Sequence, residues 1–176
     1  MRRDPIFLRI DAKRKLIDAE LAIGQDAIDN YQADYNETLK LHLLRSLGLS
    51  IHNIYNGVEA ILEDVAQEID GAKPNTAQYH RDLLFQLTQG TETRGPIITD
   101  DIIDIMSDIL GFRHVLRHNY GGSLRGAAVV EKFIKLKDRI VPDIYHQIDE
   151  LELRLSEPEQ SHGNPQSSSN PFDPEP

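Results

Sequence analysis

The chain has 176 residues, of which 39% are hydrophobic, and this is enough apolar material for one buried core in one domain. It contains no cysteine, which excludes disulfides and thiolate metal sites and fits a reducing cytosol. The formal net charge of -10 argues against indiscriminate coating of nucleic acid, because backbone binding of that kind needs a positive surface.

The N-terminal residues do not suggest export. Charge recurs at Arg9, Asp11 and Lys13, before the apolar core of a signal peptide could form. No apolar run in the sequence reaches the length that spans a membrane. We therefore expect a soluble, cytoplasmic protein with no membrane contact.

Two long amphipathic helices are predicted first. Residues from about 11 to 34 and from about 51 to 69 carry apolar side chains at spacings of three, four and seven. The apolar positions of the first are Ile10, Ile17, Leu21, Ile28, Tyr31 and Tyr35. Those of the second are Ile51, Ile54, Tyr55, Val58, Ile61, Leu62, Val65 and Ile69.

A break and a shorter helix follow. Residues 71–75 contain glycine and proline and end the second helix, Thr76 is the expected N-cap, and residues 79–87 form the third helix. Residues 89–96 are expected as loop. Thr99 followed by Asp100 and Asp101 then predicts the start of a fourth helix, since acids favour a helix N-terminus. Its expected buried stripe is Ile102, Ile105, Met106, Ile109 and Leu116.

Gly121 and Gly122 are expected to end the fourth helix, and Ser123 to cap a closing one. Pro142 interrupts the closing helix, so a kink or a restart is expected there. Its apolar positions are Val130, Phe133, Ile134, Val141, Ile144, Ile148, Leu151 and Leu155. The predicted fold class is all-α, a bundle of four or five helices over residues 1–155. Residues 156–176 are predicted to be a disordered acidic tail.

The end of the fourth helix concentrates polar chemistry. Arg113 and Arg117 can hold phosphate oxygens, His114 and His118 can exchange protons near neutral pH, and Tyr120 adds a phenol. Basic residues continue to Arg139, so a positive groove on an acidic body is one interpretation; a solvated helix face with ordinary ion pairs is the other. This cluster could handle a phosphodiester without a metal.

These residues resemble a known signature. Gly111-Phe112-Arg113, four residues, His118, one residue and Tyr120 resemble the RX4HXY motif of HepT-type toxins, within the HEPN superfamily of all-helical, metal-independent ribonucleases. Glu59, in the string Val58-Glu59-Ala60-Ile61-Leu62, is similar to the acidic residue that faces the site in that family. The sequence departs from the pattern at His114, where HepT proteins often have Asn, and at Arg117, which replaces an aliphatic residue.

The resemblance implies an endoribonuclease toxin of a type VII, HepT/MntA-like toxin-antitoxin system that needs no cofactor. His118 would act as general base on the ribose 2′-OH, Arg113 would stabilise the phosphate, and His114 and Arg117 would be accessory groups. The products would be a 2′,3′-cyclic phosphate and a 5′-OH, and DNA would not be cut. The resemblance also implies that a cognate MntA-like nucleotidyltransferase antitoxin modifies Tyr120 with AMP and blocks the RNA substrate.

Helix geometry adds an expectation about assembly. At about 100° per residue, Arg113 and His118 lie about 140° apart around one helix, so a straight helix cannot aim both at one phosphate. Either the helix unwinds beyond Asn119, or a second copy supplies the complementary group across a two-fold axis. HEPN proteins are similar in forming their sites at a dimer interface, so we expect a homodimer.

Other interpretations remain open for the same residues. Arg113 could pair with Glu59, His114 and His118 could bind a metal, and Tyr120 could pack against the bundle. His118 could be a helix C-terminal histidine favoured by the helix dipole. The domain as a whole could bind nucleotide or RNA beside a nucleotidyltransferase without cutting, or be a plain dimerisation domain. His52, His80, His146 and His162 are expected to be surface or satisfied histidines.

Overall fold

A computed structural model describes residues 3–33, 36–118 and 125–156. Within these ranges it describes the backbone but not the side chains of residues 33 and 114–118. Every regular element in these ranges is helical, which confirms the all-α prediction. The helices are α1 (Pro5–Ala33), α2 (Glu37–Glu68), α3 (Tyr79–Thr88), α4 (Asp100–His118), α5 (Gly126–Lys135), η1 (Leu136–Ile140) and α6 (Val141–Ser156). The predicted tail begins where α6 ends, and residues 157–176 lie outside the described ranges.

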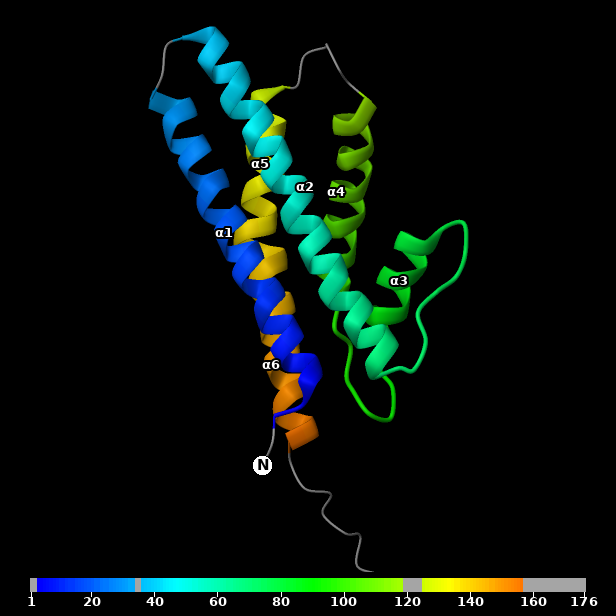
Figure 1. Cartoon of the computed structure of the whole chain (residues 1–176). Coiled ribbons are helices and arrows are strands. Elements are labelled where there is room, and N and C mark those ends of the chain that lie inside the picture. Colours follow the sequence, from blue (N-terminus) through cyan, green and yellow to red (C-terminus); the bar gives the residue numbers. More distant parts are fainter. Residues whose placement is uncertain (1–2, 34–35, 119–124, 157–176) are drawn as a thin grey trace, which may run out of the picture.

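The bundle is built around α2. Figure 1 shows α1 and α2 side by side as a long antiparallel pair, with α5 and α6 behind them, α4 beside α2 and α3 near the lower end of α2. The core residues of α2 are fully buried, among them Ile51, Val58 and Leu62. No helix in the described ranges is both long and apolar enough to cross a membrane.

Both long helices begin earlier than the sequence pattern indicates. Asp4 accepts a hydrogen bond from the backbone N–H of Ile6 at 3.0 Å, and Pro5 occupies the first helical position, where its missing N–H leaves no bond unmade. In α2 the side chain of Asn36 accepts from the N–H groups of Thr38 and Leu39. The helix therefore starts at residue 37, well before the predicted residue 51.

The start of α4 agrees with the prediction, whereas that of α3 differs. The backbone carbonyl of Thr99 accepts from Ile102 and Ile103, so α4 begins directly after Thr99. Thr76 is not the N-cap of α3, because Gln78 holds that position. The Thr76 hydroxyl instead accepts from the Gln78 N–H and donates to Asp82 at 2.5 Å, which stabilises the turn before the helix.

The closing helix passes its proline without ending. Pro142 offers no N–H and its ring would crowd the carbonyl four residues earlier. The backbone responds with the π-helical turn η1, in which the N–H of Val141 reaches back to the carbonyl of Leu136. The closing helix starts at Gly126, with Arg125 at the cap position, and Ser123 lies outside the described residues.

Most of the predicted apolar positions in this closing helix are buried. Val130 is half-buried, and Ile134 and Leu155 are exposed.

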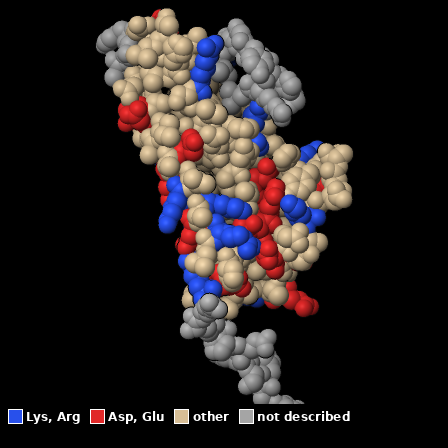
Figure 2. Space-filling view, viewed as in Figure 1, with Lys and Arg blue, Asp and Glu red and all other residues tan. Residues whose placement is uncertain are grey.

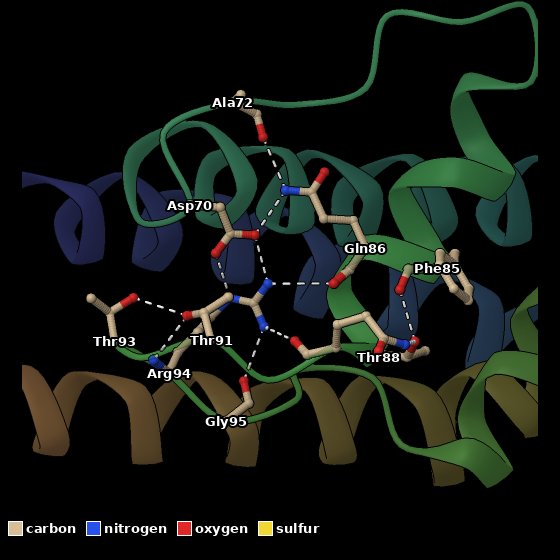
Figure 3. A network of polar contacts seen from close by, with 10 residues as sticks. Asp70, Ala72, Phe85, Gln86, Thr88, Thr91, Thr93, Arg94 and Gly95 are labelled. Carbon is tan, nitrogen blue, oxygen red and sulfur yellow. Dashed lines mark hydrogen bonds and ion pairs between the residues drawn. The ribbon is translucent and has the colours of Figure 1, made fainter.

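A buried arginine fixes the loop between α3 and α4. Arg94 is 1% exposed and holds Asp70, at the end of α2, through two hydrogen bonds of 2.7 and 2.6 Å. Its remaining N–H groups donate to the backbone carbonyls of Gln86, Gln89 and Gly95, as Figure 3 shows for this network. The loop predicted at residues 89–96 is thus anchored to α2, and α4 starts from a fixed point.

Candidate functional site: an arginine held against α2

The motif residues lie at the upper end of α4. Arg113 is half-buried there, on the side of α4 that faces α2. The backbone remains helical through His118, but the side chains of His114, Arg117 and His118 lie outside the described residues, as does all of Tyr120. Of the predicted site side chains, Arg113 alone can be placed.

Residues of α2 hold the Arg113 guanidinium. Its Nη2 donates to Oδ1 of Asn56, and the guanidinium carbon lies 4.4 Å from the centre of the Tyr55 ring. Its Nε lies 3.4 Å from Nδ1 of His52. Among the described side chains, the partners of Arg113 are thus an amide, an aromatic ring and an imidazole. No carboxylate among those side chains neutralises its charge.

The hydrogen bonds assign the state of His52. Because Asn56 Oδ1 accepts from Arg113, the Asn56 amide nitrogen is the donor towards His52 Nε2, which lies 2.9 Å away. Arg113 Nε also donates towards His52 Nδ1, and because a neutral imidazole has one acceptor nitrogen, the tautomer of His52 decides which of the two contacts is a hydrogen bond. Either contact needs a ring nitrogen without a proton, so Arg113 is the cation of the group.

Tyr55 forms the floor beneath the guanidinium. The residue is fully buried, and its hydroxyl has no hydrogen-bond partner among the described residues. Burial, and secondarily the nearby charge of Glu59, raise the pKa of Tyr55 well above its ordinary value, while Arg113 acts in the opposite direction. Tyr55 is consequently a neutral phenol whose ring supports Arg113.

The expected acidic residue has another partner. Glu59 is 7% exposed, and its carboxylate lies 2.5 Å from Nδ1 of His80 at the start of α3. The alternative in which Arg113 pairs with Glu59 is therefore wrong, because Glu59 lies a helical turn further along α2 and is paired with His80. This pair joins α2 to α3, and it satisfies a carboxylate that would be costly to bury alone.

The lysine-rich part of the closing helix lies close to acids. Lys132 contacts Asp108, Lys135 lies 2.7 Å from Glu131, and Arg139 lies 3.4 Å from an oxygen of Asp101. The face presented in Figure 2, on which α1, α2 and α3 lie in front, likewise shows positive and negative side chains next to one another over its lower half. The solvated face with ordinary ion pairs is therefore the correct interpretation of this segment.

The site residues that sequence reasoning missed are His52, Tyr55 and Asn56. The sequence pattern predicts Tyr55 as a core residue only and His52 as a surface or satisfied histidine. A signal was present, because His52 and Asn56 are four residues apart and so place polar groups on one face of α2. The sequence pattern does not show which helix packs against that face. In the structure it is α4.

The fold and this site define an all-helical bundle with a cation held at the edge between its second and fourth helices. A family model described as HepT-like protein matches residues 46–155. The chain belongs to this HepT-like family of HEPN proteins, and the membership suggests a HEPN-type toxin. Comparison with curated proteins and with solved structures found no match. The matched part begins within α2, so α1 lies outside it.

Proposed function

We propose that the protein is a metal-independent endoribonuclease toxin of a HepT/MntA-like toxin-antitoxin system. The observation that carries this proposal is the Arg113 guanidinium, half-buried in the motif helix and surrounded by uncharged partners. An arginine held in this way is pre-oriented but still has its full charge available for a phosphate. Membership of the HepT-like family supports the same class of function.

The reaction would be an internal transfer within RNA. The ribose 2′-oxygen forms a bond to the adjacent phosphorus while the bond from phosphorus to the 5′-oxygen breaks. His118 takes the 2′-OH proton, the departing 5′-oxygen receives a proton for which His114 is the candidate donor, and Arg113 stabilises the negative charge that develops on the phosphate. Arg117 is a candidate second contact to the phosphate. The 2′,3′-cyclic phosphate and the 5′-OH account for every atom, so no water is consumed in this step.

The geometry of α4 favours a shared site in a homodimer. Because the backbone stays helical through His118, the separation of about 140° between Arg113 and His118 applies within one chain. The α2 face that bears His52 and Asn56 continues upward to Leu41 and Leu49, which are 44% and 60% exposed. The exposed Arg45 lies between these two leucines on the same face. Exposed leucines beside the guanidinium suit a second copy of the chain, whose His118 would meet this chain's Arg113.

The proposed regulation acts on Tyr120. Transfer of AMP to its hydroxyl by a nucleotidyltransferase antitoxin would add bulk and negative charge close in sequence to Arg113 and His118. An anion there would compete with the RNA phosphate for the guanidinium. The adduct would therefore silence the toxin without unfolding it.

Cleavage of RNA in the presence of EDTA tests the catalytic proposal. The wild-type chain should cut, and Arg113→Ala and His118→Ala should each lose activity while keeping the helical circular dichroism spectrum. Arg125→Ala is a matched control, because it removes an exposed arginine outside the motif helix. Equal cleavage by all four proteins would refute the assignment. Binding of RNA without cleavage by any of them would favour the alternative, a non-catalytic binding partner of a nucleotidyltransferase.

Mixing the two inactive variants tests the shared site. If Arg113 and His118 act from different chains, a heterodimer of Arg113→Ala and His118→Ala contains one intact pair and should recover part of the activity. A failure to recover, with heterodimers verified by native mass spectrometry, would mean that each chain builds its site alone.

A further inference from the structure

The outer face of α1 carries an uncovered apolar stripe. Leu8, Leu16 and Ile23 are 56%, 70% and 51% exposed, and the exposed Ala12 and Ala19 lie between them. At about 100° per residue these positions fall within an arc of about 80° on one side of the helix. Surface leucines are ordinary when they are scattered, but a continuous row along several turns indicates a contact surface.

The stripe is additional to the face with which α1 packs in the bundle. Ile10, Ile17 and Ile28 are buried on that other face. A helix that is apolar on two sides is typically covered on both. Because the family match begins at residue 46, α1 and its stripe lie outside the matched part of the fold.

The order of residues in the stripe makes it complementary to itself. Large and small side chains alternate, and the series reads the same in shape from either end: leucine, alanine, leucine, alanine, isoleucine. If two copies pack antiparallel, Leu8 lies opposite Ile23 of the second copy and Ala12 lies opposite Ala19. The two Leu16 side chains then meet near the two-fold axis. The alanines allow close approach of the helices at the points between the larger contacts.

Charge along α1 selects the antiparallel direction. Basic residues dominate before Leu16 and acidic residues follow it: Arg9, Lys13, Arg14 and Lys15 precede, and Asp18, Glu20, Asp26 and Asp29 follow.

Most of the basic residues have partners in their own chain: Arg9, Lys13 and Arg14 pair with Glu68, Asp64 and Asp149. Among the described residues Lys15 has no ion pair, and Asp18 accepts a hydrogen bond from the Tyr145 hydroxyl but has no ion pair. Antiparallel packing brings Lys15 within a helical turn of Asp18 of the second copy, whereas parallel packing places these two residues on opposite flanks of the contact.

We propose that the outer face of α1 binds the same face of a second copy in an antiparallel arrangement. The occupant is another copy of this chain, because both the alternation of size and the distribution of charge complement themselves. This contact lies on α1, away from the α2 and α4 face that carries Arg113, and it does not depend on RNA cleavage. It joins two chains whether or not those chains are nucleases.

Single cysteines test the contact directly, since the natural chain has none. Leu16→Cys should form a disulfide-linked dimer under mild oxidation, because the two sulfurs would meet close to the two-fold axis. Leu8→Cys should not link to itself, since its two copies would lie roughly 22 Å apart along the paired helices. A mixture of Leu8→Cys and Ile23→Cys chains should link as a heterodimer.

Phe85→Cys is the matched control, because Phe85 is 64% exposed but lies on α3. The proposal is overturned if Leu16→Cys links no faster than Phe85→Cys. It is also overturned if Leu8→Cys links to itself as fast as Leu16→Cys, which would mean a parallel contact. In sedimentation, Leu16→Glu should halve the mass of the wild-type assembly, and an unchanged mass would equally refute the contact. Neither measurement uses RNA, so failure here leaves the nuclease proposal untouched.

Discussion

The anchor at Arg94 gives a quantitative prediction. Its side chain is completely buried and that of Asp70 is 8% exposed, so Arg94→Met leaves an unpaired carboxylate at the end of α2. The change also removes the donors to the carbonyls of Gln89 and Gly95. Removal of one partner of a buried ion pair typically reduces the free energy of unfolding by about 3–5 kcal/mol. With a shift of about 2–4 °C per kcal/mol for a domain of this size, Tm should fall by roughly 6–20 °C.

Urea unfolding followed by circular dichroism measures this effect. Arg139→Met is the control, because the pair of Arg139 with Asp101 is largely exposed and should contribute less than about 1 kcal/mol. The double variant Asp70→Leu with Arg94→Met should be less destabilised than the sum of its single changes, since no buried charge is left alone. A loss below about 1 kcal/mol for Arg94→Met, or full additivity in the double variant, would refute the reasoning.

Three further predictions concern packing, titration and catalysis. Gly24→Ala should destabilise by about 1–3 kcal/mol, because the new methyl would lie 2.1 Å from the Phe133 ring. Gly111→Ala, which meets no described side chain within 4 Å, should stabilise α4 by up to about 1 kcal/mol, and urea unfolding checks both changes. Tyr55→Phe should be neutral or slightly stabilising at pH 7, since it removes a hydroxyl without a partner. Burial raises the Tyr55 pKa, so the free energy of unfolding of the wild type should fall as pH rises above about 10, the ordinary tyrosine value, and that of the variant should fall less. An equal fall of the two free energies with pH would contradict this. Arg113→Lys should reduce RNA cleavage by about 100-fold, because an ammonium cannot reproduce the planar contacts of a guanidinium, and wild-type rates in the variant would contradict the proposed role.

The sequence was a good guide where one face of a helix is apolar and the other is not. The fourth helix begins where Thr99 and the acids after it predict, and the third helix occupies nearly the expected residues. The first half of α2 was missed because its leucines are distributed around the helix: Leu44 and Leu47 are buried, whereas Leu41 and Leu49 are exposed. A helix with apolar residues on more than one side gives no clean period.

The contacts that build the site were beyond sequence patterns for a different reason. Arg94 and Asp70 are 24 positions apart in the chain, and Arg113 and Asn56 are 57 positions apart. No local spacing reports such a pair, since it exists only once the helices are packed. The motif made Arg113 a candidate site residue, but its partners on α2 follow from the tertiary structure alone.

End-group analysis of RNA cleaved in EDTA tests whether this chain cuts RNA by attack of the ribose 2′-OH. The substrate is one RNA sequence, synthesised both as all-ribose and with 2′-deoxyribose throughout. The account predicts that the all-ribose strand yields 2′,3′-cyclic phosphate and 5′-OH ends, that the deoxy strand stays intact, and that Arg113→Ala leaves both uncut. Cleavage of the deoxy strand, or 5′-phosphate ends from the ribose strand, would contradict it.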